Sequence, residues 1–490
     1  MAKESKFTRN ATMDKTICYK SNSYRRGKNL LFILIISILN QSCNKTNSDV
    51  HVLFVGDILL SRNVSQELQI KNSSPWSELK PTFQSAELVI GNLEGAVGKI
   101  EDQFISDSDS PVFNIDSSYI SLLSKAGFKI ITLENNHSFD LGASGKENTI
   151  QALLHNDIAP IFFDNSPQFF TVKNVVIALI VINLVPGRDF NKSEIPSIEL
   201  KQKLRLAKSL ANIVVVSVHW GSELLDWPNN KQRENAEWLV SNGADLIIGS
   251  HPHVIQQPEL IKGKPVFFSL GNHLFDQKYP STKEGLIVDL FIHKNKFNCS
   301  GIITHTKVDS YYPKIIETKN FKFKPFQFRD SPFKINDYIL KPVSVSENHQ
   351  NRTVLRAYRN GKIVWETHPM SIISITSSKL DDKNEFLIIL ERHYSNMDGE
   401  TNIRPYVYQV DDKGLIAKWR GSALAWPLLD ATISPYDNSI LCALHRGDSF
   451  INPDSTNTST RVAAYKWNGF GFTGLSDSVT CKSCEKLFSK

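Results

Sequence analysis

Between residues 51 and about 320, short apolar runs alternate with segments of helical spacing. Seven runs are strand-like, and each ends at or near a Gly, Asn, Asp or His: 51–57, 86–94, 129–137, 175–184, 212–221, 245–253 and 265–272. The helical segments are 117–127, 145–157 and 231–243. This succession predicts an α/β domain over 51–320, with closing strands near 283–315. Polar groups at the carboxyl ends of such strands usually form the rim of a binding site.

The first 43 residues have the pattern of an export segment. A basic stretch that ends at Lys28 precedes the apolar run 30–39. Ten apolar residues are too few to span a bilayer comfortably but suit a signal peptide. Cys43 follows this run, so we expect lipidation there and a membrane-anchored location in the bacterial cell envelope. Plain cleavage or an uncleaved anchor is the alternative, and Met13 is an alternative start.

The formal net charge of +6 belongs to this N-terminal segment. Residues 1–42 contain eight Lys or Arg and two acidic residues, whereas the remainder contains 48 basic and 48 acidic residues. A balanced remainder gives no electrostatic footprint for nucleic acid, so we expect no nucleic-acid partner. The 41% hydrophobic content is sufficient for large cores.

From about residue 343 the pattern changes to aromatic hairpins. Three segments combine an aromatic strand, an Asn-Gly or Lys-Gly turn and a second strand: 356–365, 406–419 and 463–472. Their tyrosines at 358, 408 and 465 are spaced 50 and 57 residues apart, as in propeller blades. Three blades cannot close a ring. We therefore expect a linker over 321–342 and a small all-β domain over 343–478 that resembles part of a propeller.

The remaining tail, 479–490, contains a C-x-x-C pair. Zinc binding by Cys481 and Cys484 requires two more ligands, and none is obvious nearby. In an oxidising compartment a local disulfide between them is favoured, with an idle thiol pair as the alternative.

Metal-capable side chains recur at the predicted strand ends. They are Asp57, Asn92, Glu94, Asn135, Asn136, His137, Asp140, His219, His251, His253, Asn272 and His273. One histidine after an apolar run is usually a satisfied core residue, but so many buried polar groups are hard to explain by packing. Carboxylate, amide and imidazole donors without thiolate suit Mn, Fe or Zn better than calcium. We predict two divalent metal ions that share a bridging carboxylate and activate water.

Six ordered motifs resemble those of CapA-type capsule (poly-γ-glutamate) synthesis proteins, members of the calcineurin-like metallophosphatase superfamily. The motifs are "FVGDILLSR" (54–62), "GNLEGAV" (91–97), "GFKIITLENNHSFDLG" (127–142), "VVSVHWGSE" (215–223), "GADLIIGSHPHVIQQPE" (243–259) and "FFSLGNHLFD" (267–276). The resemblance covers residues 51–315. It implies a four-layer α/β/β/α sandwich with a two-metal site at the strand ends.

The resemblance also implies a role for each matched residue. The implied metal ligands are Asp57, Asn92, Glu94 as the bridging acid, Asn136, His219, and His251 and His253 with one to each metal. His137 is the implied general acid, and Asp140 orients it. Arg62 and Glu223 are weaker candidates for substrate contacts. For Arg62, a surface salt bridge is the alternative.

Two positions depart from the pattern of the superfamily. The usual first motif is Asp-x-His, but Leu59 stands where the histidine belongs, a lack that the CapA-type proteins share. The family usually reads "SLGNF", whereas this chain has His273 in place of the phenylalanine. His273 either replaces the lost ligand or lines the pocket.

These features favour a metal-dependent hydrolase or transferase of capsule or poly-γ-glutamate biosynthesis. Its substrate would be an anionic polymer or a small molecule with an amide or phosphoester bond. The alternative is a non-catalytic polymer-binding or export component that works with capsule-synthesis partner proteins. A degenerate structural domain is the third possibility. The hydrolase hypothesis needs His137 as general acid, whereas a polymer-binding component would tolerate its loss.

Overall fold

The computed structural model describes residues 49–488 with several gaps. The gaps are 100–110, 189–191, 308, 322, 324–325, 328–332, 348–349, 396–399, 422–423, 425–427, 448–458 and 477. The predicted export segment and Cys43 lie outside the described residues, so both stay predictions. Among the described residues, no helix has the length and apolarity needed to span a bilayer.

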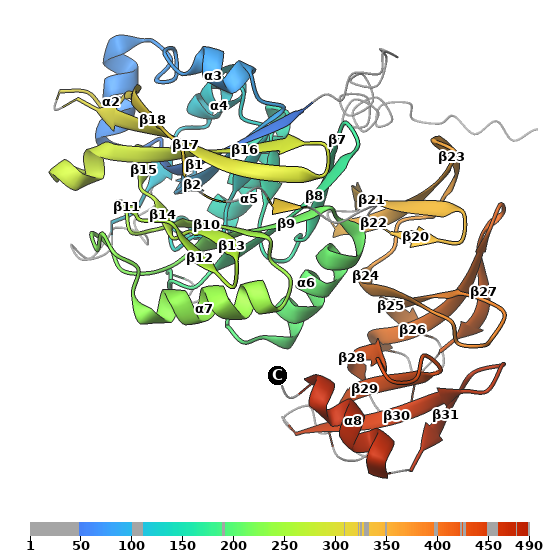
Figure 1. Ribbon diagram of the computed structural model, residues 1–490. Coiled ribbons are helices and arrows are strands. Elements are labelled where there is room, and N and C mark those ends of the chain that lie inside the picture. The colour runs from blue at the N-terminus through green and yellow to red at the C-terminus, as the bar shows by residue number, and fades with distance from the viewer. Residues whose placement is uncertain are drawn as a thin grey trace, which may run out of the picture. The chain divides into compact units, whose positions relative to one another are not determined.

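Two large sheets form the α/β part of the chain (Figure 1). The main path of the nine-stranded sheet is β18–β17–β16–β1–β2–β5–β6, with β15 beside β1 and β19 beside β17. Its strands are β1 (Val50–Leu59), β2 (Leu88–Glu94), β5 (Ile130–Thr132), β6 (Ala159–Ile161), β15 (Asn272–Leu274), β16 (Glu284–His293), β17 (Lys296–Thr306), β18 (Pro313–Lys319) and β19 (Phe326–Gln327). Strands β1, β2, β5 and β6 are parallel, whereas β16, β17 and β18 close the sheet in antiparallel fashion, as predicted.

The six-stranded sheet has the order β12–β13–β10–β9–β8–β7. Its strands are β7 (Gln168–Val172), β8 (Val175–Asn183), β9 (Ile213–His219), β10 (Leu246–Ser250), β12 (Glu259–Ile261) and β13 (Lys264–Phe267). The four central strands are parallel, and β7 and β12 run antiparallel at the edges. Two small ribbons pair β3 (Ala96–Val97) with β4 (Asn114–Ile115) and β11 (Ile255–Gln256) with β14 (Ser269–Leu270).

Helices follow the parallel strands. They are α2 (Arg62–Lys71), α3 (Lys80–Gln84), α4 (Ile120–Ala126), α5 (Gly142–His155), α6 (Ile198–Leu210) and α7 (Asn230–Ser241), with short 3-10 helices η2 (Ser117–Tyr119) and η3 (Pro280–Lys283). Helix α7 begins at a capping box. The Asn229 side chain accepts from the Gln232 amide at 2.9 Å, and the Gln232 side chain accepts from the Asn229 amide at 3.0 Å. Such caps pair N–H groups that otherwise have no partner in the helix.

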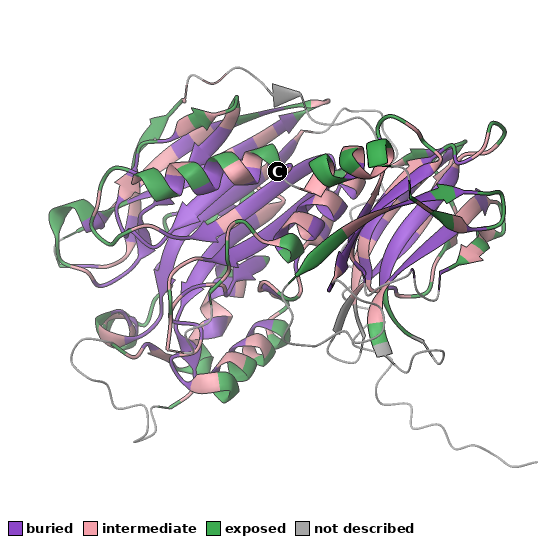
Figure 2. Ribbon diagram, turned by 90° about the horizontal axis from the view of Figure 1, so that it is seen from below, coloured by how far each residue is buried: buried purple, intermediate pink, exposed green. Residues whose placement is uncertain are grey.

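Three apolar clusters organise these elements. One joins side chains of both sheets, such as Phe54 and Val215. A second joins the nine-stranded sheet to helices α2 to α5, and a third joins the six-stranded sheet to α6 and α7. Figure 2 shows buried central strands and helices with exposed outer faces. The predicted mixed α/β class is confirmed.

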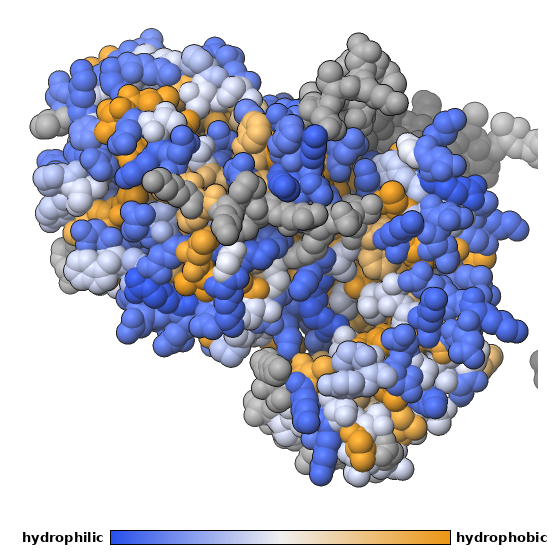
Figure 3. All heavy atoms as spheres, in the orientation of Figure 1, coloured by the Kyte–Doolittle hydropathy of each residue, from blue (hydrophilic) through white to orange (hydrophobic). Residues whose placement is uncertain are grey.

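The C-terminal region is rich in strands, as predicted. A four-stranded sheet contains β20 (Lys334–Ile335), β21 (Tyr338–Glu347), β22 (Gln350–Arg359) and β23 (Lys362–Glu366). An eight-stranded sheet contains β24 (Ile372–Ser378), β25 (Phe386–Ser395), β26 (Glu400–Asp411), β27 (Gly414–Arg420), β28 (Leu428–Ile433), β29 (Ile440–Arg446), β30 (Thr460–Trp467) and β31 (Phe472–Leu475). In the view of Figure 3, hydrophilic residues cover most of the surface and hydrophobic residues form smaller separate patches.

The three predicted hairpins are present, but they do not form separate blades. They are β22–β23, β26–β27 and β30–β31. The second and third lie in the same eight-stranded sheet, and the first lies in the four-stranded sheet. The tyrosine spacing therefore reflects recurring hairpin chemistry and not a repeated propeller unit.

The predicted local disulfide in the C-x-x-C pair is wrong. Cys484 is bonded to Cys442 of β29, 42 residues earlier, and Cys481 is free. The tail forms helix α8 (Ser478–Phe488), which packs on β29 and β30. This packing buries Cys484 beside Cys442 and Ala464, so the tertiary contact and not the sequence spacing selects the partner.

Candidate metal centre

The parallel strands bring the predicted ligands to one edge of the two sheets. Asp57 lies near the end of β1 in register with Asn92 of β2. Glu94 ends β2, and His219 ends β9. His251 and His253 follow β10, whose last residue is in register with His219.

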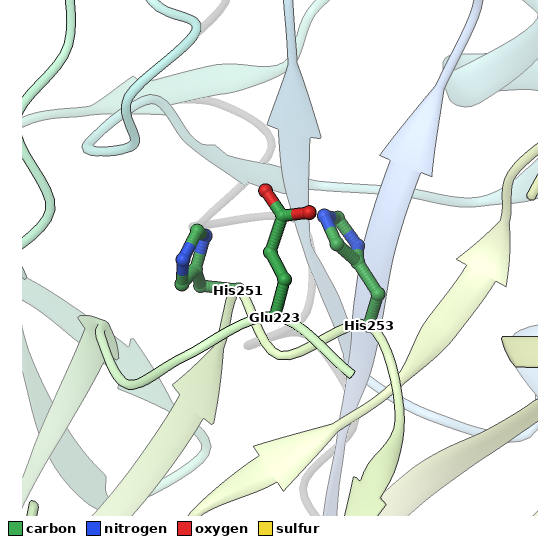
Figure 4. A group of neighbouring side chains, drawn as sticks. All are labelled: Glu223, His251 and His253. Atoms are coloured by element: carbon green, nitrogen blue, oxygen red, sulfur yellow. The ribbon is translucent and has the colours of Figure 1, made fainter. Parts of the chain in front are cut away.

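Two groups of side chains have the spacing of metal ligands. In the first, one ligand atom each of Asp57, Glu94 and His219 lies within 4.8 Å of the others, and all three residues are buried. In the second, Glu223, His251 and His253 have the same spacing. Figure 4 shows the Glu223 carboxylate directed between the two imidazoles.

Asp57 is held by neighbouring donors. Its Oδ1 accepts from Nδ2 of Asn92 at 2.8 Å, and its Oδ2 accepts from the backbone amide of His251 at 3.2 Å. The Asn92 oxygen accepts in turn from Asn135 Nδ2 at 3.1 Å and Thr132 Oγ1 at 3.3 Å. The contacts to the Asn92 oxygen therefore orient the amide so that its nitrogen donates to Asp57. The predicted contact between Asn92 and a metal stays a prediction.

Glu94 is a buried carboxylate without a hydrogen-bond partner on either oxygen. Its oxygens lie 4.0 Å from Nε2 of His219 and 4.0 Å from Nε2 of His253. Burial, together with the charge of Asp57, raises the pKa of Glu94 well above its usual value. An unpartnered buried carboxylate is costly, and a cation between these residues would remove that cost.

The second nitrogen of two histidines is fixed by a neighbour. Nδ1 of His253 lies 2.9 Å from Oδ1 of Asn272, and Nδ1 of His219 lies 2.9 Å from Oγ of Ser250. Both contacts leave Nε2 facing Glu94. Nε2 of His219 also lies 2.8 Å from Oδ1 of Asn136. Metal-binding histidines are usually oriented by such partners.

Burial and charge set opposite protonation tendencies within the cluster. Burial lowers the pKa of His219 well below its usual value and, with His253 nearby, lowers the pKa of His251 to about 3. Burial also opposes protonation of His253, but Glu94 and Asp57 outweigh it and raise the pKa of His253 to about 9. His219 and His251 are therefore neutral at pH 7, the form that binds metal.

The backbone that carries His251 and His253 is strained. Their φ angles are +93° and +59°, in a region that non-glycine residues rarely adopt. Each such residue costs about 1–3 kcal/mol, and such strain clusters at functional sites.

His137 and Asp140 lie together, as the resemblance implies. Asp140 Oδ2 lies 2.9 Å from Nδ1 of His137 and accepts from the backbone amide of Phe113 at 2.7 Å. The Phe113 ring stacks on the imidazole with 3.9 Å between centroids. Arg188, which the sequence patterns did not indicate, lies on the other oxygen of Asp140 at 3.6 Å.

Arg62 lies over the same aromatic ring. Its guanidinium carbon is 4.5 Å from the Phe113 centroid. Asp276 accepts from Nε of Arg62 at 3.1 Å and also contacts Nη2, so the pairing is bidentate. The salt bridge considered as the alternative for Arg62 is therefore present. Its partner, Asp276, is the last residue of the motif 267–276, and the sequence patterns did not predict a role for it.

His273 does not belong to the centre. Its Nε2 accepts from Nε1 of Trp76 at 3.0 Å, and its ring packs near Phe83 and Phe128. Burial lowers its pKa to about 3. The suggestion that His273 replaces the lost ligand is wrong, because its side chain lies in the apolar core and not at the strand ends.

The donor set fits metal binding. It combines carboxylates, imidazoles and an amide, and it includes buried atoms without partners on Glu94 and at Nδ1 of His251. Such donors suit Mn, Fe or Zn.

Comparison with known proteins identifies similar sequences. The profile of a family described as "Bacterial capsule synthesis protein PGA_cap" matches residues 51–277. The chain is 30% identical over 281 residues to "PGA biosynthesis protein CapA" of Bacillus subtilis, covering 53% of this chain and 74% of that protein. It is 28% identical over 273 residues to "Capsule biosynthesis protein CapA" of Bacillus anthracis, covering 51% of this chain and 66% of that protein.

Proposed function

Since the chain belongs to the CapA-type bacterial capsule synthesis family, we propose that it is an envelope-located, two-metal hydrolase or transferase. Its substrate is an anionic polymer of the poly-γ-glutamate kind, or a related amide or phosphoester. The unpartnered buried carboxylate of Glu94, set between His219 and His253, carries this proposal. Family and fold alone would not fix the chemistry.

The proposed ligands divide between two divalent ions, Mn, Fe or Zn, within a four-layer metallophosphatase-like sandwich. They are Asp57, Asn92, Glu94, Asn136, His219, His251 and His253. Bound ions of this kind supply an activated water and stabilise negative charge on the attacked group.

The chain's own side chains position the substrate and move the proton. His137 donates a proton to the leaving group from Nε2, because Nδ1 of its ring is held by Asp140. Arg62, fixed by Asp276, presents a cation to an anionic group of the substrate. Phe113 packs between Arg62 and His137 and keeps their spacing.

The test is metal content and hydrolysis by the whole chain. Elemental analysis of the wild type is expected to give about two equivalents of Mn, Fe or Zn, with loss in His219→Ala. His155→Ala, on the exposed end of α5, is the matched control. Model γ-glutamyl amides and phosphoesters then test for hydrolysis. Metal without hydrolysis would favour the polymer-binding or export component, and absence of metal after loading would overturn the two-metal proposal.

A further inference from the structure

The first strand cannot supply a second ligand. Leu59, which stands where the superfamily pattern has a histidine, is fully buried in the cluster between β1 and α2. Of the residues that match this pattern, Asp57, Glu94 and His253 are left around one metal position. Nδ1 of His253 lies 3.4 Å from Oδ2 of Asp57, and Nε2 on the other side of the ring lies 4.0 Å from Oε2 of Glu94. That position is one donor short.

The side chain of Glu223 lies beside two histidines of the centre. Among the described residues, no hydrogen bond or ion pair involves its side chain, although one oxygen lies within 4.8 Å of ligand atoms of both His251 and His253. Glu223 is an exposed residue, and Figure 4 shows its carboxylate directed toward the two rings. Nδ1 of His251 is itself buried without a hydrogen-bond partner.

The loop that carries Glu223 is fixed on both sides. The amide of Leu224, whose φ is +61°, donates to the carbonyl of Pro252 between the two histidines at 2.9 Å. The buried Gln256 amide donates to the carbonyls of Leu225 at 2.8 Å and Trp227 at 3.0 Å. The backbone of this loop is therefore tied to the histidine segment itself.

On the other side of the loop, Gly221 is required. Its φ is +92°, and a Cβ there would lie 2.8 Å from the side-chain amide of Gln232, the residue of the α7 capping box. A side chain at this position would crowd Gln232 and strain the backbone, so glycine suits it. Glu223 follows two residues later.

Charge decides between a substrate contact and a ligand. A carboxylate that faced an anionic substrate would repel it, whereas a carboxylate beside two imidazoles favours a divalent cation. We infer that Glu223 is a metal ligand that supplies the donor lost at Leu59, grouped with His251 and His253. This inference rests on the proposed two-metal function. One carboxylate and two imidazoles form a mixed oxygen and nitrogen set, which suits Mn, Fe or Zn.

The experiment compares metal binding by Glu223→Gln, Glu223→Ala and the wild type as whole chains. Mn²⁺ and Zn²⁺ are titrated by calorimetry, and bound metal is counted by elemental analysis. The loss of a ligand is expected to exceed the roughly 10–100-fold cost of losing a supporting residue, so we expect one of two equivalents to weaken by more than about 100-fold. Asp226→Asn, an exposed acid in the same loop, is the matched control.

The outcomes separate this inference from the proposed function. Two tight equivalents in wild type and in both Glu223 variants would overturn the role of Glu223 and leave the two-metal centre intact. No binding in the wild type would overturn both. Equal weakening in Asp226→Asn would show a general charge effect and would also overturn the ligand assignment. Thermal melting of the metal-free variants verifies folding, and Glu223→His is expected to restore part of the affinity.

Discussion

Asn272 links the ring of His253 to the loop between β15 and β16. Its Oδ1 lies 2.9 Å from Nδ1 of His253, and its Nδ2 donates to Oε1 of Gln277 at 2.9 Å and to the carbonyl of Thr282 at 3.1 Å. One amide therefore fixes both the rotation of the imidazole and the position of the loop.

Replacement of Asn272 by alanine is expected to weaken metal binding without removing a ligand. The His253 ring would lose the acceptor that keeps Nε2 toward Glu94, a loss that typically costs about 10–100-fold in metal affinity. Calorimetric titration with Mn²⁺ measures the effect. Asn298→Ala, on the exposed side of β17, serves as the control. Unchanged affinity in Asn272→Ala would show that the ring is held by other contacts.

Asp140→Asn is expected to slow hydrolysis while metal content stays unchanged. The amide can still accept from Phe113 but no longer stabilises a protonated His137, and general acid catalysis typically contributes about 10²–10⁴-fold. The measurement is kcat with the best model substrate. Because the two residues act as a unit, the double variant with His137→Ala should be no slower than His137→Ala alone. If the losses in kcat of the two single variants add in the double variant, His137 and Asp140 act independently and the prediction is contradicted.

Stability of the metal-free protein is expected to fall between pH 6.5 and 9. The folded pKa of His253 is raised to about 9 by Glu94 and Asp57, so its contribution is complete below the unfolded pKa near 6.5 and is lost as pH rises through 9. The lowered pKa of His251, about 3, has the opposite effect and makes stability rise from pH 3 to 6.5.

Melting temperatures of the metal-free protein across pH 4–9.5 test this pattern. His253→Gln should flatten the alkaline limb, whereas His155→Gln should not. Saturating metal should also flatten that limb, because the bound form already has His253 deprotonated. An alkaline limb that persists in His253→Gln would assign it to another group.

Much of the α/β part follows from local sequence. Buried strands need continuous apolar runs, so β1, β8, β9 and β10 were predictable, and polar residues at their ends were expected to meet because the strands are parallel. Helix α6 was not among the predicted helices, although Leu200, Leu204 and Ala207 form its buried face at helical spacing.

The orientation of adjacent side chains was harder to predict. Asn272 and His273 both follow an apolar run and both can bind metal. They lie in β15, where successive side chains point to opposite faces. Asn272 therefore faces His253, whereas His273 faces Trp76 in the core. Which of the two side chains faces the metal centre depends on the register of β15 with β1, a tertiary pairing that one sequence does not reveal.

The disulfide between Cys442 and Cys484 provides the last prediction. It closes a loop of 42 residues and fastens α8 to β29, and constraint of the unfolded chain by such a loop stabilises a protein by about 4 kcal/mol. Cys484→Ser is expected to lower the free energy of unfolding of the strand-rich region by about this amount in urea, followed by tryptophan fluorescence. Cys481→Ser, which leaves the bond intact, is the control. If the two variants lose the same stability, or if reductant leaves the wild type unchanged, the bond contributes nothing to the docking of α8.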